Sequence, residues 1–69
     1  MTEIKLRDEF IKLGQAIKAV NLVESGAEAK EVIQNGLVKV NGEVCTMRGK
    51  KLVDGDVIFY DGTEVKIVG

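Results

Sequence analysis

A continuous stretch beginning at Ser25 combines a helix start, a helix stop and a tight turn. Ser25 and Glu28 have the spacing of a capping box, in which the serine accepts from a backbone N–H three residues on and the glutamate returns the bond. Gly36 stands where a left-handed residue ends a helix. Asn41 and Gly42 follow alternating apolar residues, which predicts a turn with positive φ at both positions. The stretch therefore predicts a capped helix that leads directly into a β-hairpin.

Hydrophobic spacing predicts further short elements around this stretch. We expect helices over residues 13–21 and 26–35, and strands over 3–6, 38–40, 43–44, 57–60 and 64–68. The second helix is expected to bury three residues and to leave four exposed: Ala29, Val32 and Ile33 inside, and Ala27, Lys30, Glu31 and Gln34 outside. Because the connection between the helices is short, we expect them to pack antiparallel or nearly so. The sequence thus predicts an α+β fold with two or three short helices on a small, mainly antiparallel sheet.

Length and composition limit the function classes. The chain has 69 residues, which predicts a single domain over 1–69 with a largely aliphatic core. It has no apolar run long enough to span a bilayer. Its one cysteine, Cys45, has no partner for an internal disulfide, which favours a reducing cytoplasm.

Charge is distributed unevenly along the chain, although the net charge is only −1. Between residues 39 and 51 there are four basic residues and one acid, Glu43. From residue 54 onward there are four acids and one basic residue, Lys66. The pattern predicts a polarised molecule whose cations gather on one side, rather than a domain that binds any nucleic acid by bulk charge.

The order of elements resembles the S4 RNA-binding domain, also called the αL motif, in two runs: LVESGAEAKEVIQNGLVKVNGEV and RGKKLVDGDVI. The resemblance covers about residues 13–59, and the chain is most similar to small stand-alone bacterial members of the family. It implies two short helices and a small sheet, with the second helix and the following hairpin loop facing RNA. Many members carry Ser-Arg-Ser at the start of the second helix. Ser25-Gly26-Ala27 stands there in this chain, so one arginine contact is missing.

The resemblance and the charge pattern together predict an RNA-binding surface. We expect contacts from nine residues: Ser25, Gly26, Ala27, Lys30, Gln34, Lys39, Arg48, Lys50 and Lys51. The start of the second helix offers backbone N–H groups that suit a phosphate. If about five cations meet phosphates, log K falls with log salt at a slope of roughly −3.5 to −4.5. Gln15 and Lys18 either flank this surface or belong to a plain exposed helix face.

The expected partner is structured RNA, either ribosomal RNA or transfer RNA, and we expect a ribosome-associated monomer without a small-molecule substrate. Catalysis is not expected, because the chain has no histidine to act as a base near neutral pH. We expect Cys45 to be a packing residue, and Asp54, Asp56 and Asp61 to serve the geometry of glycine turns. No cofactor or metal site is expected.

Two alternatives stay open. The run Leu52–Val57 resembles the late turn of β-grasp proteins, which include sulfur carriers and protein-interaction domains. Such carriers need a Gly-Gly end, whereas this chain ends in Val68-Gly69. The helix-before-hairpin order also differs from theirs. The acidic balance of the chain also allows a protein–protein adaptor that has kept the fold without RNA affinity.

Overall fold

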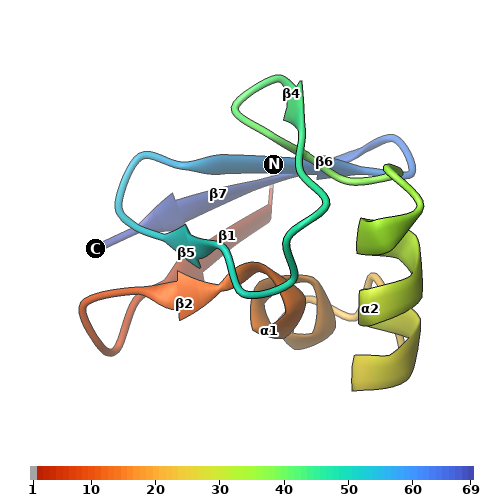
Figure 1. The fold of residues 1–69 in the computed structure, drawn as a ribbon. Coiled ribbons are helices and arrows are strands. Elements are labelled where there is room, and N and C mark those ends of the chain that lie inside the picture. Colours follow the sequence, from red (N-terminus) through yellow and green to blue (C-terminus); the bar gives the residue numbers. More distant parts are fainter. Residues whose placement is uncertain (1) are drawn as a thin grey trace.

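The computed structural model describes residues 2–69, which form two helices and seven short strands. In chain order the elements are β1 (Thr2–Lys5), β2 (Ile11–Lys12), α1 (Leu13–Ala19), α2 (Gly26–Gln34), β3 (Lys39–Val40), β4 (Glu43–Val44), β5 (Lys51–Leu52), β6 (Val57–Tyr60) and β7 (Thr63–Val68). Both helices lie on one side of the larger sheet (Figure 1).

The larger sheet has the strand order β1-β7-β6-β3-β4. Only the β1–β7 pair is parallel, and the other pairs are antiparallel. A second, two-stranded antiparallel sheet joins β2 to β5. The predicted α+β fold with a mainly antiparallel sheet is therefore confirmed. The strands β2 and β5 were not predicted, because they are short and pair across about 40 residues of chain, with no turn motif between them to indicate the pairing.

The two helices cross steeply, with α1 seen nearly end-on and α2 from the side in Figure 1. The predicted antiparallel packing is therefore wrong. The connection between the helices does not turn straight back. Asn21 takes a left-handed φ of 60°, and Val23 is then buried in the core. The first helix also ends at Ala19, two residues before its predicted end.

The start of α2 confirms half of the predicted capping box. The Ser25 hydroxyl accepts from the Glu28 backbone N–H at 3.2 Å. The Glu28 carboxylate returns its bond to the N–H of Glu24 at 2.8 Å, rather than to that of Ser25. The helix buries Ala29, Val32 and Ile33, as predicted.

The Asn41-Gly42 turn has positive φ values of 53° and 86°, as predicted. The Asn41 side chain has an additional role. Its oxygen accepts from the Val57 N–H at 2.9 Å, and its amide donates to the Asp56 carboxylate at 3.0 Å. The second Asp56 oxygen accepts from the Val53 N–H at 2.9 Å. These contacts join the β3–β4 hairpin to the turn before β6.

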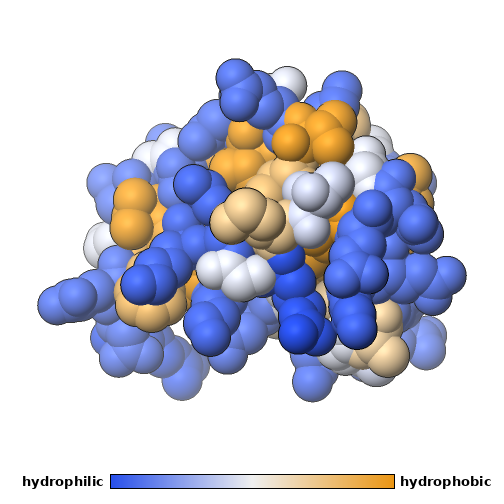
Figure 2. Space-filling view, in the orientation of Figure 1, coloured by the Kyte–Doolittle hydropathy of each residue, from blue (hydrophilic) through white to orange (hydrophobic). Residues whose placement is uncertain are grey.

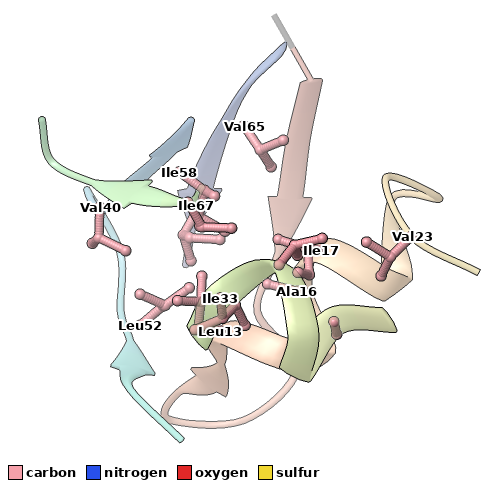
Figure 3. Close-up of a cluster of buried hydrophobic side chains, with 13 residues drawn as sticks. Leu13, Ala16, Ile17, Val23, Ile33, Val40, Leu52, Ile58, Val65 and Ile67 are labelled. Atoms are coloured by element: carbon pink, nitrogen blue, oxygen red, sulfur yellow. The ribbon is translucent and has the colours of Figure 1, made fainter. Parts of the chain in front are cut away.

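The core lies between the helices and the inner face of the sheet (Figure 3). Its largest fully buried side chains are aliphatic: Leu13, Ile17, Ile33, Leu52, Ile58, Ile67, Val38 and Val65. Along β7 the inward Val65 and Ile67 alternate with the exposed Glu64 and Lys66, so the latter pair lies on the outer face. No helix within residues 2–69 combines the length and apolar content needed to cross a membrane.

Candidate nucleic-acid interface

The first helix is capped by a distant segment of the chain. Its N-cap residue is Lys12, whose ammonium group has no lone pair with which to accept a hydrogen bond. The Leu13 N–H instead donates to the Lys50 carbonyl at 2.9 Å, and the Gly14 N–H donates to the Arg48 carbonyl at 3.1 Å. A bond of 3.1 Å from the Lys50 N–H to the Met47 carbonyl closes this segment into a turn. Residues 47–50, here called the basic turn, are therefore fixed against the start of α1.

A groove of about 430 Å³ lies where α1, α2 and the basic turn meet. It is lined by Lys12, Gly14, Gln15, Lys18, Gly26, Ala29, Arg48 and Gly49. Three glycines and an alanine leave space in this cationic groove, while Lys12, Lys18 and Arg48 supply positive charge. None of these lining residues, all within the described chain, is acidic. Figure 2 shows hydrophilic side chains over much of the lower part of this face, where the helices and the basic turn lie.

Two of the nine predicted RNA contacts line the groove, and three others lie on the same side of α2 as Gly26 or at its N-cap. Gly26 and Arg48 line the groove directly. Ser25 caps α2 immediately before Gly26, and Lys30 and Gln34 follow Gly26 at intervals of four residues along the same side of the helix. Ala27, although exposed in the same first turn, is not among the lining residues.

The other three predicted cations, Lys39, Lys50 and Lys51, do not line the groove. Lys50 borders a second hollow of about 490 Å³, which lies beside the β3–β4 hairpin. The Lys51 ammonium lies 4.9 Å from the centre of the Phe10 ring, a cation–π distance. Lys39 pairs with Phe59 in the sheet and alternates with the buried Val40, so it lies on the outer face. The structure therefore does not bring Lys39 to the groove.

Several groove residues were missed or left open by sequence reasoning. Gln15 and Lys18, whose role was left open, line the groove. Their signal was their position off the apolar face of the first helix. Lys12 gave no such signal, because it reaches the groove through the pairing of β2 with β5, which depends on residues far apart in the chain.

The chemistry of the groove suits phosphate groups. Lysine and arginine bind phosphate oxygens through charge-assisted hydrogen bonds, and arginine does so with a planar fork of donors. No aromatic side chain is among the lining residues on which a base would stack. Residues 2–69 also bring together no group of three or more histidine, cysteine, aspartate or glutamate side chains that would hold a metal ion. The arrangement therefore favours contact with a sugar–phosphate backbone.

Asp56 is the one described group whose pKa departs clearly from its ordinary value. The Val53 N–H and the Asn41 amide both donate to its carboxylate, and Lys50 adds electrostatic attraction. These contacts hold the pKa of Asp56 below its ordinary value, although partial burial opposes them. Asp56 lies outside the lining of the groove and ties the hairpin to the adjoining turn.

Known proteins are similar to this chain in both sequence and fold. The S4 domain family matches over residues 4–68. The chain is 39% identical over 59 residues to RlbA of Bacillus subtilis (strain 168), a probable ribosome maturation protein, covering 86% of this chain and 83% of that protein. It is 38% identical over 58 residues to YbcJ of Escherichia coli (strain K12), a putative RNA-binding protein, covering 84% and 83% of the two chains.

The fold is also similar to the solution structure of Escherichia coli YbcJ, which revealed an αL motif involved in RNA binding. The TM-score is 0.77 at 34% identity, and the match covers 100% of this chain and 89% of that one. The predicted resemblance and fold are thus confirmed by sequence and by structure. The chain belongs to the S4 domain family.

Proposed function

We propose that this chain is a binding module for structured RNA and that the cationic groove holds the RNA backbone. The observation that carries the proposal is the concentration of charge. Lys12, Lys18 and Arg48 line one groove together with no acid, although the chain as a whole has a net charge of −1. A local positive field of this kind attracts phosphates without making the whole molecule bind every polyanion.

The proposed mechanism is recognition of backbone positions. Lys12, Lys18 and Arg48 bind phosphate oxygens, and Lys30, one turn along α2 from Gly26, binds a further phosphate. The small side chains of the groove let a sugar–phosphate backbone come close to the protein backbone. Phosphate contacts by themselves read no base sequence, so selectivity comes from an RNA fold that presents its phosphates in the matching arrangement.

Ribosomal RNA is the proposed partner, and transfer RNA is the alternative tested against it. The name of the Bacillus subtilis relative, a probable ribosome maturation protein, favours ribosomal RNA. The proposal places a monomer in the cytoplasm and includes no catalytic step. Within the described chain the Cys45 thiol donates to the Met47 carbonyl at 3.7 Å, which fits the packing role expected for it.

The β-grasp alternative receives no support from the chain order, because both helices precede the β3–β4 hairpin.

The adaptor alternative is tested by crosslinking the protein to its partners in living cells and sequencing the attached RNA. We expect crosslinks concentrated in folded segments of ribosomal RNA and reduced when Lys18 and Arg48 are replaced by glutamine. Crosslinks to transfer RNA would redirect the proposal to that partner. Crosslinks to protein alone would contradict RNA binding and favour the adaptor.

A further inference from the structure

Gly14 and Arg48 lie so close together that a side chain at position 14 would collide with Arg48 unless one of the two residues moved. A Cβ atom placed on Gly14 would lie 2.9 Å from Cγ of Arg48 and 3.6 Å from both Cδ and the carbonyl oxygen of Arg48. The backbone bond of 3.1 Å from the Gly14 N–H to the Arg48 carbonyl holds the two residues together. Cγ of Arg48 is only two bonds from the Cα atom of Arg48. The side chain therefore cannot avoid an added methyl group at position 14 by moving only its guanidinium end.

Glycine at position 14 is unfavourable for the helix itself. Gly14 lies within α1 and has no left-handed backbone angle, so its own conformation suits any residue. Alanine forms helices more readily than glycine, because glycine loses more conformational freedom on folding. The contact with Arg48 supplies the reason for a glycine here.

We propose that Gly14 is a positioning residue for Arg48. The missing side chain lets the stem of Arg48 pass over the first turn of α1, and this places Arg48 in the wall of the groove with Lys18. The inference rests on the proposed function for its effect on RNA, since it names the residue that orients one of the proposed phosphate ligands. Its structural part is independent of RNA.

A double-mutant cycle tests the effect on RNA, with purified ribosomal RNA as the probe. We expect Arg48→Ala to weaken binding about tenfold, because a hydrogen bond to a charged group contributes about that factor. Gly14→Ala should weaken binding by a similar factor. The double variant Gly14→Ala/Arg48→Ala should bind no worse than Arg48→Ala alone, since both changes remove the same contact.

The outcomes of the cycle separate the inference from the proposed function. If Arg48→Ala binds as the natural protein does, the proposed role of the groove is wrong. If Arg48→Ala weakens binding but Gly14→Ala does not, the groove stands and the positioning role is overturned. If the double variant binds more weakly than Arg48→Ala, the methyl at position 14 obstructs RNA directly, which also overturns the inference.

Amide hydrogen exchange tests the structural part without RNA. In Gly14→Ala we expect faster exchange of the Leu13 N–H, because the basic turn that supplies the Lys50 carbonyl is pushed away. The double variant should restore the protection, since Arg48→Ala removes the clashing Cγ atom. Unchanged protection in Gly14→Ala would overturn the inference. If Gly14→Ala does not fold, refolding in the double variant supports the clash with Arg48, and a double variant that also fails to fold contradicts it.

Discussion

Lys12 and Lys51 lie directly opposite each other in the antiparallel pair of β2 and β5. Residues opposed in this way project from the same face of a ladder, and like charges there are destabilising. Lys51 lies over the Phe10 ring, and Lys12 lines the cationic groove. The pairing therefore holds Lys12 in the groove opposite a like charge, at a cost in stability, as expected where a charge is retained for binding.

Replacing Lys12 with glutamine should raise stability while weakening RNA binding. Relief of the repulsion with Lys51 is expected to increase the free energy of unfolding by about 0.2–1 kcal/mol at low salt. Lys66→Gln is the matched control, because Lys66 faces Glu3 across β1 and β7 on the outer face. That change should lower stability slightly and leave RNA binding unchanged. Urea denaturation and filter binding give the two readouts, and a Lys12→Gln protein that is less stable but binds RNA normally would refute the assignment.

Replacing Asn41 with glycine should destabilise the fold through the lost side-chain bonds. Glycine keeps the left-handed backbone of the turn, so the loss reports on the contacts with Val57 and Asp56, and we expect about 1–2 kcal/mol. Asp61→Gly is the matched control, because Asp61 has a similar φ of 51° at the same position of the next hairpin turn. That variant should stay within about 0.5 kcal/mol of the natural protein. Equal effects of the two changes in thermal denaturation would show that the Asn41 bonds contribute nothing.

Stability should fall in acid through Asp56. Folding lowers the pKa of this carboxyl, so the unfolded chain takes up its proton at a higher pH than the folded chain does. The contribution is therefore fully present above about pH 4 and is lost as the pH falls through the lowered folded value. In Asp56→Asn the side chain keeps only one accepting oxygen for the Asn41 amide and the Val53 N–H. The variant should therefore be less stable than the natural protein at pH 7, and the difference in the free energy of unfolding should shrink below about pH 4. A constant difference between pH 7 and pH 3 would contradict this account.

The parts of the fold that were predicted correctly have local signals. Asn41-Gly42 fixes a turn by its own backbone preference, and Ser25 caps α2 from the adjoining position. The parts that were missed depend on distant partners. The carbonyls of Arg48 and Lys50 cap α1 from across the fold, which no local motif at the start of the helix indicates.

The candidate site shows the same division. Arg48 was predicted from local charge, and it lines the groove. Lys39 was predicted from the same charge cluster, but strand alternation with the buried Val40 sends it to the outer face. Lys12 is brought in only by the β2–β5 pairing. Charge clustering along the chain therefore indicated one cation of the candidate groove, whereas strand pairing determines which of the other lysines reach it.

The most direct test of the groove is the salt dependence of ribosomal RNA binding. The variant Lys18→Gln/Arg48→Gln removes two charges from the groove, and Lys39→Gln/Lys66→Gln removes two from the outer face, so both carry the same net charge. If two phosphate contacts are lost, the slope of log K against log salt should become shallower by about 1.4–1.8 in the groove variant. The outer-face variant should keep the slope of the natural protein. Equal changes in the two variants would contradict the account, because binding would then follow net charge rather than the groove.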